Sequence, residues 1–540
     1  MPIGTKLTFR PATCYSVLLA LVLALGVWVR VAHFPAIPPG LNQDEAASAY
    51  EAFSLAATGH DKWGTPWPVY FPAWGSGQNV LLAYLTVPVV KLFGLNVFTA
   101  RVVMLVLGLG TLPLLAWCLR PVGRFVALLA TLTLAVAPWH FMLSRWGLES
   151  NALPFFMLLG CGLLARALST GRRRWIVPSL LPFAYSLYAY GTTAVVLPPL
   201  LAVVLALSWR QVRAQWRAWL LAFGLFGVAA LPFGIFFAEN YLAHRNFAWT
   251  DSLFFATPLL IASRAGQVGG GPLADTLAAN FRFLLSGCDD GTNYNLLPGY
   301  KLLLSTTLPL ALLGALLGAW QLVRRRGHVL ATPAGAVLTV LAAWGLASLT
   351  LFCSIGLNVN RFNHFYLPCI ALAAWAVAVT VRSLQPSVPR SLVRAGVLAW
   401  TLAAGGLAVY QYFSSYPAGA IREQFNAGLD EAFAALDGLW GTSQVRITDR
   451  LPLPYVYTLF YTRYPPAQFQ REAQVRVVGD AYQVRRFGRY VFVPEELTNS
   501  HAYAYLSHRN EYPDTPEQHR QIIFTNDLWE VGLMQPGPRP

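Results

Sequence analysis

The stretch YSVLLALVLALGVWVRVA, which runs from Tyr15 to Ala32, decides the class of fold. A helix of about 20 mostly apolar residues crosses the hydrocarbon core of a bilayer, and this stretch is apolar enough to do so. The rest of the chain has the same character, because 56% of its 540 residues are hydrophobic and only 12% are charged. An ordinary soluble domain carries about 25% charged residues. The chain is therefore predicted to be an integral membrane protein.

Further apolar runs follow as far as Phe413, and about eleven in total are long enough to span a membrane. They are residues 15–32, 97–119, 125–138, 150–168, 175–190, 191–208, 218–237, 300–322, 331–353, 364–381 and 395–413. One additional run, 79–93, contains Pro88 and Lys91. It is predicted to be a helix that lies along the outer surface or dips into it.

The positions of the arginines predict the orientation of the chain. Most arginines fall in short clusters between apolar runs, which is the pattern of the positive-inside rule. Lys6 and Arg10 precede the first run, so the N-terminus is predicted to be cytoplasmic. The net charge of +15 then reflects topology, and nucleic acid is not an expected partner because no soluble domain carries a basic face.

Four segments are predicted to lie outside the membrane, namely residues 34–98, 139–151, 238–300 and everything after Ser414. The last of these combines a helical pattern with short runs such as QVRIT and RYVFV, which are typical of strands. The predicted fold is an α-helical polytopic membrane protein with outer juxtamembrane helices. Residues 1–413 form its transmembrane domain, and residues 414–540 form a small α/β extracytoplasmic domain.

The sequence QDEA places Asp44 and Glu45 just outside the first predicted span. A structural interpretation is that Asp44 caps a helix over residues 45–58. A functional interpretation is that Asp44, Ser48 and Glu51 share one helical face, and ionisable groups near the membrane usually have a task. The sequence leaves both interpretations open.

The second outer segment, APWHFMLSRWGLESN, offers His140, Arg145 and Glu149. Arg145 and Glu149 are four residues apart, so they could form a local ion pair of about 0.3–0.5 kcal/mol on a helix surface. Alternatively, Glu149 is a second acid that Arg145 orients across an outer cavity from Asp44.

The third group of candidates is in NVNRFNHFY, a short loop between two predicted spans on the outer side, in which Arg361 lies close to Asn360 and His364. An arginine on the outer side runs against the positive-inside bias, so it is expected to meet an anionic partner. Simple contact with lipid headgroups is one interpretation. Bidentate binding of a carrier-lipid phosphate is the other.

The first outer loop adds further polar and aromatic groups, namely His60, Asp61, Lys62, Trp63, Trp74, Gln78 and Asn79. Most of its aromatic residues are expected to belong to an interfacial belt, although one or two could stack on a sugar ring. No certain cofactor is indicated. A divalent metal held by Asp44, His140 and Glu149 is left open, because no ligand spacing is specific.

These residues together resemble the C-type superfamily of membrane glycosyltransferases. The resemblance is closest to its protein O-mannosyltransferase and aminoarabinose transferase branch, which includes the bacterial members labelled glycosyltransferase family 39. The first outer loop, from NQDEAASAYEAF through FPAWGSGQNVLLAYLTVPVVKLFGLN to Arg101, carries its most specific part. One departure is that the HPPL or KPPL segment of the relatives is replaced by GSGQNVLL, with Gln78 and Asn79 at the basic and proline positions.

The resemblance implies an inverting transfer of a sugar from a polyprenyl-phosphate donor to an acceptor hydroxyl on a protein, lipid or glycan, at the outer face of the membrane. Asp44 would be the base, with Glu45 beside it and Glu149 as the second acid. Arg145 and Arg361 would bind the carrier phosphate, with Asn360 and His364 nearby. The lack of a secretory disulfide set favours a bacterial plasma membrane and a role in the cell envelope.

A transporter or flippase of lipid-linked sugars is the alternative function, and a scaffold whose tail binds cell-wall polymer or protein is another. A transporter predicts polar sites near the bilayer midplane and internal repeats. Here the polar clusters lie at the outer ends of spans, so glycosyl transfer is the preferred hypothesis.

Overall fold

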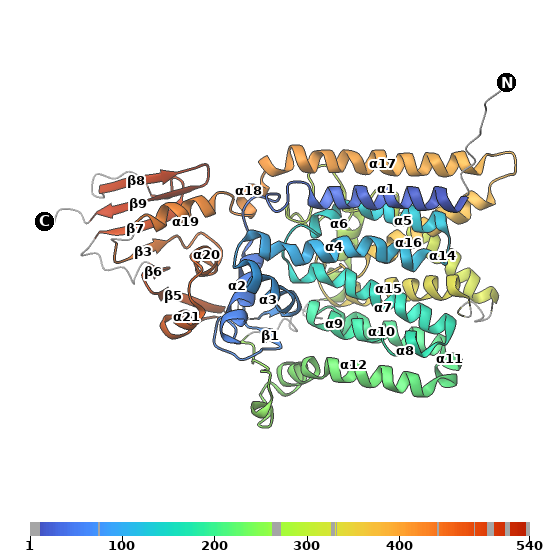
Figure 1. Ribbon diagram of the computed structural model, residues 1–540, viewed down its shortest axis with the longest axis horizontal. Coiled ribbons are helices and arrows are strands. Elements are labelled where there is room, and N and C mark those ends of the chain that lie inside the picture. The colour runs from blue at the N-terminus through green and yellow to red at the C-terminus, as the bar shows by residue number, and fades with distance from the viewer. Residues whose placement is uncertain are drawn as a thin grey trace, which may run out of the picture.

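The computed structural model describes residues 11–73, 76–261, 272–325, 330, 332–439, 442–479, 481–493, 502–512 and 519–535. They form two parts, a bundle of helices and a smaller unit of mixed helices and strands near the C-terminus (Figure 1). The first part consists of apolar helices, and its buried core combines residues that are far apart in the sequence. The predicted membrane fold with a C-terminal α/β unit is therefore confirmed.

The helices of the first part follow one another as α1 (Pro11–Val31), α2 (Gln43–Thr58), α3 (Leu81–Phe93), α4 (Val97–Leu119), α5 (Arg124–Val136), α6 (Pro138–Leu143), η1 (Glu149–Ala152), α7 (Leu153–Thr170), α8 (Arg173–Ile176), α9 (Leu181–Ala189), α10 (Thr193–Leu207), α11 (Trp209–Ala214), α12 (Trp216–Phe237), η2 (Ala238–Ala243), η3 (Thr250–Ser252), α13 (Leu273–Leu285), α14 (Thr307–Arg325), α15 (Pro333–Ser354), α16 (Tyr366–Ser383) and α17 (Arg390–Ser414). A two-stranded ribbon of β1 (Tyr70–Phe71) and β2 (Gln78–Asn79) precedes α3.

Seven helices of the described residues are long and apolar enough to cross a membrane, and they lie at Thr13–Val31, Val97–Leu119, Glu149–Thr170, Trp216–Ala243, Pro333–Ser354, Tyr366–Ser383 and Arg390–Ala418. The predicted spans near α5, α10 and α14 are apolar but shorter helices. The predicted span 175–190 is split between α8 and α9. The structure therefore confirms a multi-pass membrane protein without confirming the number eleven.

Helices α2 and α3 lie across the end of the bundle, beside the C-terminal unit (Figure 1). They pack on each other, and α3 buries Leu81, Leu82 and Ala83 while Leu92 and Phe93 at its other end stay exposed. This one-sided burial is consistent with the predicted surface helix.

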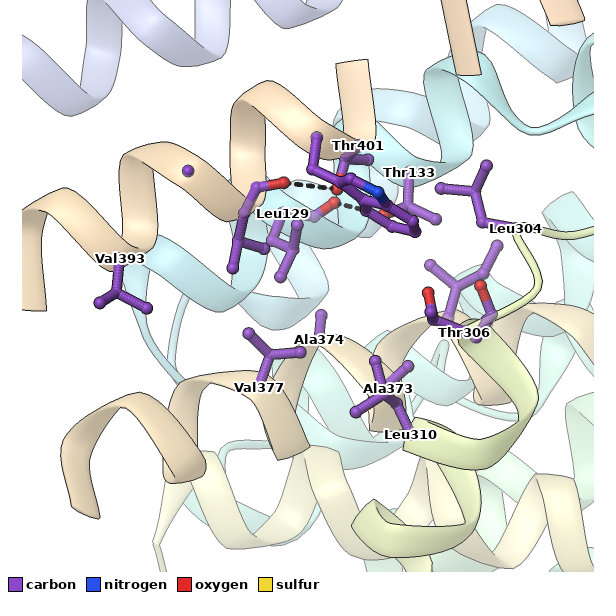
Figure 2. A pocket seen from close by; sticks show the side chains of 15 residues that line it. Leu129, Thr133, Leu304, Thr306, Leu310, Ala373, Ala374, Val377, Val393 and Thr401 are labelled. Atoms are coloured by element: carbon purple, nitrogen blue, oxygen red, sulfur yellow. Dashed lines mark hydrogen bonds between the residues drawn. The ribbon is translucent and has the colours of Figure 1, made fainter. Parts of the chain in front are cut away.

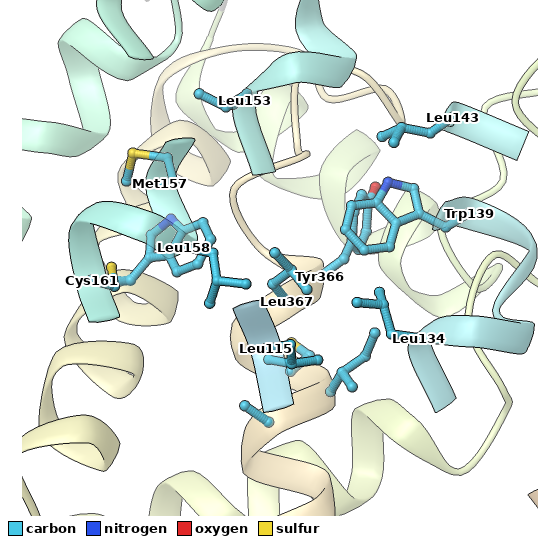
Figure 3. Packing of buried hydrophobic residues seen from close by; sticks show 14 of the residues in the cluster. Leu115, Leu134, Trp139, Leu143, Leu153, Met157, Leu158, Cys161, Tyr366 and Leu367 are labelled. Carbon is cyan, nitrogen blue, oxygen red and sulfur yellow. The ribbon is translucent and has the colours of Figure 1, made fainter. Parts of the chain in front are cut away.

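The 139–151 segment is fixed in the core of the bundle. The indole of Trp139 packs 4.9 Å from the ring of Tyr366, between helices that also contribute Leu115 and Leu134 (Figure 3). Its Nε1 donates a hydrogen bond of 2.8 Å to Asn363. The second and third predicted site segments are therefore joined to each other by a buried contact.

The C-terminal unit contains a seven-stranded sheet in the order β4-β5-β6-β3-β7-β9-β8. Strand β3 pairs parallel with β6 and β7, and the other pairs are antiparallel. The strands are β3 (Val445–Ile447), β4 (Gln474–Val478), β5 (Ala481–Phe487), β6 (Tyr490–Val491), β7 (Tyr503–His508), β8 (His519–Thr525) and β9 (Trp529–Gln535), and the helices are η6 (Tyr416–Ala418), α18 (Ile421–Gln424), α19 (Leu429–Asp437), α20 (Pro454–Tyr461) and α21 (Pro466–Glu472).

The apolar core of this unit extends onto α2. Leu41, Ala46 and Tyr50 belong to the same buried cluster as Leu459 and Trp529. Helix α2 is consequently shared between the two parts, with one side on α3 and α4 and another on α20 and α21.

Candidate functional site

The helix that carries QDEA begins at Gln43, and its N-cap is Asn42. The Asn42 side chain accepts a hydrogen bond of 3.0 Å from the Asp44 N–H, and Glu45 reaches back to the Asn42 N–H in a capping box. The interpretation of Asp44 as the cap is therefore wrong, because Asn42 already satisfies this helix end. The helix ends at Gly59, whose φ of 73° is left-handed.

Glu45 forms a buried ion pair with Arg101 of α4. Arg101 donates from Nε to Oε1 at 2.9 Å and from Nη2 to Oε2 at 2.8 Å, and neither side chain is exposed. Oε1 also accepts from the Gly147 N–H at 2.7 Å. Glu45 therefore connects α2 with α4 and with the 139–151 segment. Asp44, the other of the two adjacent acids, does not take part in this connection.

Arg101 itself has every N–H donor engaged. Besides Glu45, it donates to the carbonyls of Pro35, Pro38 and Gly40 at 2.6–2.8 Å. The guanidinium of Arg101 thus holds the chain between α1 and α2 in place through three backbone carbonyls. The sequence signal for this residue was an arginine inside an otherwise apolar run, since a charge at such a position needs a partner.

Asp44 is partly buried at a junction of three segments. Its backbone carbonyl accepts a 3.2 Å hydrogen bond from Gln78 Nε2. Burial, together with the charges of Asp290 and Asp44, raises the pKa of Tyr294. Burial, with contributions from Tyr461 and then Asp44, likewise raises the pKa of Tyr457 in the C-terminal unit. The carboxylate of Asp44 therefore lies within electrostatic range of both hydroxyls.

The C-terminal unit holds the start of α2 in place. Asn426 Nδ2 donates to the Leu41 carbonyl at 3.2 Å and to Tyr457 Oη at 2.7 Å, and Tyr457 Oη donates to the same carbonyl at 3.4 Å. A Cβ on Gly40 would overlap the Phe425 carbonyl oxygen, and φ at Gly40 is +77°. We call Asn426, Tyr457 and the Leu41 carbonyl the Leu41 clamp.

Arg145 does not face a cavity. Its guanidinium donates to the carbonyls of Val29, Arg30, Ala32 and Ile37 at 2.7–3.2 Å. These include carbonyls at the end of α1 that have no partner within the helix. The predicted contact of Arg145 with a carrier phosphate is therefore not supported, because its three nitrogen atoms are occupied by the backbone.

Glu149 lies at the start of η1 and is 5% exposed. Helix α6 ends at Leu143, so Arg145 and Glu149 do not share one helical face, and the predicted i, i+4 pairing does not apply. The Gly147 contact with Glu45 places this segment next to the start of α2. Asp44 and Glu149 thus belong to neighbouring segments.

His140 is fully buried against Arg30, whose Nη2 lies 2.7 Å from Nδ1. Arginine only donates hydrogen bonds, so Nδ1 accepts and is not free to bind a metal. Arg30 also donates to the carbonyls of Gly26, Leu134 and Ala135 at 3.0–3.1 Å. Among the residues that the structure describes, no three His, Cys, Asp or Glu side chains gather as a metal site.

Arg361 lines a cavity of about 330 Å³ between α10, α12, η2 and α15. Its walls are mostly apolar, with Phe233, Phe236 and Leu351, and the polar groups Tyr70, Asn79 and Tyr190 also border it. Arg361 Nη1 donates to the Gly356 carbonyl at 2.8 Å. The structure thus brings Arg361 and Asn79 together, as the sequence did not foresee, whereas Asp44 and Glu149 do not line this cavity.

Asn360 and His364 do not line the cavity that Arg361 borders. His364 is unexposed, and its Nδ1 accepts a 3.3 Å hydrogen bond from Trp344 Nε1. Asn360 borders a small space with Trp146 and Tyr294. The predicted contact of His364 with the carrier phosphate is not supported, because this side chain is enclosed in the bundle.

The polar groups of the first outer loop lie under the C-terminal unit. Lys62 is paired with Glu51, and its N–H donates to Glu51 Oε2 at 2.8 Å. The Trp63 ring lies 5.6–6.0 Å from the rings of Tyr455, Phe469 and Tyr482.

Lys62 is therefore buried and not open to a sugar, whereas Trp63 is half-buried with its ring among aromatic side chains of the C-terminal unit. Of the remaining candidates in this loop, His60 is half-buried with Nδ1 2.7 Å from the Thr58 carbonyl, and Gln78 and Asn79 are buried. Trp74 lies outside the described residues.

Asp61 gives this cluster a pH dependence that can be measured. Burial and the charge of Glu51 raise the pKa of Asp61 from 3.8 to about 7. The folded protein then keeps this proton to a higher pH than the unfolded chain, so the free energy of unfolding falls as pH rises from about 4 to about 7. Asp61→Asn is expected to flatten the melting temperature between pH 5 and 8. An unchanged slope, or equal flattening by exposed Asp449→Asn, would contradict this.

Comparison with solved structures identifies the class of fold. ArnT from Cupriavidus metallidurans in the apo state matches with a TM-score of 0.57 at 16% identity, over 97% of this chain and 98% of that one. The same protein bound to undecaprenyl phosphate matches with a TM-score of 0.57 at 14% identity, over the same shares. The Archaeoglobus fulgidus oligosaccharyltransferase in complex with zinc and sulfate matches at 0.48 and 16%, over 82% and 56%. The two ArnT matches show that the chain has the fold of ArnT.

Comparison with family models gives a match over part of the chain. Residues 41–247 match the model described as dolichyl-phosphate-mannose-protein mannosyltransferase. This region begins at the Leu41 clamp and includes α2 with QDEA. A search of curated proteins found no match. The resemblance identified from the sequence is confirmed, because residues 41–247 match this mannosyltransferase family model and the chain has an ArnT-like fold.

Proposed function

We propose that the protein transfers a sugar from a polyprenyl-phosphate donor to an acceptor hydroxyl at the outer face of a bacterial plasma membrane, with inversion at the anomeric carbon. The observation that carries this proposal is the apolar cavity bordered by Arg361 and Asn79. ArnT, whose fold this chain shares, has a structure with bound undecaprenyl phosphate. A transporter has no comparable support.

On the donor side, the cavity suits a molecule with an isoprenoid chain and a phosphate. Phe233, Phe236 and Leu351 offer apolar walls for the chain. Arg361 offers a planar guanidinium that pairs with phosphate oxygens. Gln78 and Asn79 stand where the relatives have a basic and proline pair, so two uncharged amides replace a cation and a proline near the donor.

On the acceptor side, Asp44 accepts the proton of the attacking hydroxyl. Phosphate is already a fair leaving group, so the reaction needs one base and positive charge on the departing phosphate, without a general acid for an alkoxide. Glu45 acts as a positioning residue through Arg101, and Glu149 supplies negative charge from the neighbouring segment. The acceptor is a protein, lipid or glycan hydroxyl.

The orientation belongs to the same proposal. The N-terminus is cytoplasmic, and the C-terminal unit, residues 414–540, is extracytoplasmic. Arg120 and Arg124 lie between α4 and α5 at the end away from that unit, as the positive-inside rule requires of cytoplasmic loops. A cysteine-accessibility experiment on intact cells, with single cysteines at Asp251 and Arg173, would label only the first.

The donor assignment predicts the effect of replacing Arg361. Arg361→Gln is expected to raise KM for the polyprenyl-phosphate sugar roughly 10–100-fold, because hydrogen bonds to a charged group contribute about 1.5–3 kcal/mol. Arg361→Lys should restore part of the loss, since it keeps the charge without the bidentate geometry. Purified protein and a panel of polyprenyl-phosphate sugars provide the assay.

Arg282→Gln is the matched control, because Arg282 lies exposed on α13 and bonds to its own helix. An unchanged KM in Arg361→Gln would remove this residue from the donor site. Absence of transfer by the unmodified protein with every donor in the panel would overturn the proposed function itself.

A further inference from the structure

A second cavity lies on the other side of the bundle, between α5, α14, α16 and α17 (Figure 2). Its volume is about 420 Å³, within the range of about 300–1,000 Å³ typical of small-molecule sites. Leu129 of α5, Leu310 of α14, Ala374 of α16 and Val393 of α17 contribute to its walls. None of the proposed donor or acceptor residues takes part.

The walls of this cavity are suited to an apolar ligand. The hydroxyls of Thr133 and Thr401 point at it but are already bonded at 2.9 Å to carbonyls of their own helices, Leu129 and Val397 (Figure 2). Trp400, which also lines it, is 49% exposed. The cavity therefore opens sideways, towards the acyl chains of the bilayer.

One end of the cavity is strongly basic. Arg390 and Arg394 lie within one turn of Val393 at the start of α17, the end of the helix farthest from the C-terminal unit (Figure 1). The guanidinium of Arg394 lies 5.6 Å from the centre of the Phe125 ring, one turn before Leu129 on α5. Its Nε is buried and has no hydrogen-bond partner among the described residues. Arg382 at the end of α16 adds a third cation.

No carboxylate in these helices balances that charge. The sequence contains no Asp or Glu in residues 62–148, 150–238 or 291–422, which include all of α5, α14, α16 and α17. The ion pairs found among the described residues involve Lys62, Arg101, Arg422 and Arg520. The anion that meets Arg390 and Arg394 must come from outside these helices.

We propose that this cavity binds an anionic phospholipid of the membrane, with one acyl chain between α5, α14, α16 and α17 and the phosphate at Arg390 and Arg394. An acyl chain satisfies the apolar walls, and basic pockets between transmembrane helices on the cytoplasmic side are known to suit anionic headgroups. The site is separate from the proposed donor cavity, which is built from α10, α12, η2 and α15.

Native mass spectrometry of the full-length protein in detergent tests this proposal. Phosphatidylglycerol and phosphatidylcholine with identical acyl chains are titrated separately, without any sugar donor. Phosphatidylglycerol is expected to bind at least roughly tenfold more tightly, because each arginine near an anionic headgroup favours binding severalfold. Since no transfer is measured, the result is independent of the proposed function.

Two variants distinguish the contribution of the acyl-chain cavity from that of the phosphate contact. Gly396→Phe places a ring where a Cβ has open space around it, so it fills the cavity without disturbing α17. Arg390→Gln with Arg394→Gln removes the charge and keeps the cavity. Each change is expected to weaken phosphatidylglycerol binding at least roughly tenfold, and only the second should abolish the preference over phosphatidylcholine.

The matched controls lie on other helices. Gly224→Phe changes an open position on α12, and Arg210→Gln with Arg213→Gln removes two exposed cations of α11. Both controls are expected to bind phosphatidylglycerol as the unmodified protein does. Equal losses in these controls, or equal affinity of the unmodified protein for the two lipids, would overturn the proposal and leave only non-specific annular lipid.

Discussion

Replacing Asp44 by Asn is expected to reduce sugar transfer at least roughly 100-fold and to leave the melting temperature unchanged. General base catalysis contributes about 10²–10⁴-fold, and Asn cannot accept the hydroxyl proton. Stability should not change, because Asn42 rather than Asp44 caps α2 and Glu45 rather than Asp44 holds Arg101. The measurement is initial rate with purified protein at saturating donor, together with thermal unfolding in the same detergent.

Asp275→Asn is the control for Asp44→Asn, because Asp275 is an exposed carboxylate on α13. It should transfer sugar at the normal rate. Equal turnover by Asp44→Asn and the unmodified protein would remove Asp44 from the chemistry. A fall in activity that follows a fall in melting temperature would instead assign Asp44 a structural role.

Replacing Glu45 by Gln is expected to lower the free energy of unfolding by about 3–5 kcal/mol, which is the cost of breaking a buried ion pair by removing one partner. Gln leaves the Arg101 charge buried without a carboxylate and weakens the acceptor for the Gly147 N–H. Activity should fall with the folded fraction. Thermal unfolding and the yield of monodisperse protein measure the effect.

The surface pair of Arg422 with Asp527 provides the comparison. Its two atoms are 3.0 Å apart, but the side chains are 37% and 78% exposed, and exposed pairs contribute only about 0–1 kcal/mol. Asp527→Asn should therefore have little effect. Equal destabilisation by Glu45→Gln and Asp527→Asn would mean that breaking the buried pair lowers stability no more than breaking the exposed pair.

Joint replacement of the buried pair by apolar residues is not expected to restore stability. In other proteins such swaps are often neutral. Here Arg101 also satisfies the carbonyls of Pro35, Pro38 and Gly40, and an apolar side chain would leave them without a donor. Full recovery in Glu45→Leu with Arg101→Met would show that these three contacts contribute little.

The sequence predicted those parts of the fold that depend on local hydrophobicity. The long apolar runs became helices, and the run at 79–93 became α3 at the end of the bundle beside the C-terminal unit. The span predicted at 175–190 failed because Pro178 and Pro182 fall within it, and proline interrupts a helix by removing an amide donor. Hydropathy averages over such interruptions, so it overstates the length of the helix.

The site was less predictable, because charge and spacing do not reveal where a side chain points. Arg145 and Arg361 both stand in outer segments, yet Arg145 binds backbone carbonyls of the α1 end and Arg361 borders a cavity. The contact of Asn426 with Leu41 joins residues 385 positions apart. No local pattern could disclose that pairing, since it depends on how the C-terminal unit docks.

The Leu41 clamp has a consequence for the order in which the protein is made. Chains emerge from the ribosome N-terminus first, and their domains fold in that order. The Leu41 carbonyl at the start of α2 therefore receives these two donors only after Asn426 and Tyr457 have been synthesised. A nascent chain that stops short of these residues lacks the contacts that hold the start of α2, so the segment that carries QDEA is completed only by synthesis of the last quarter of the chain.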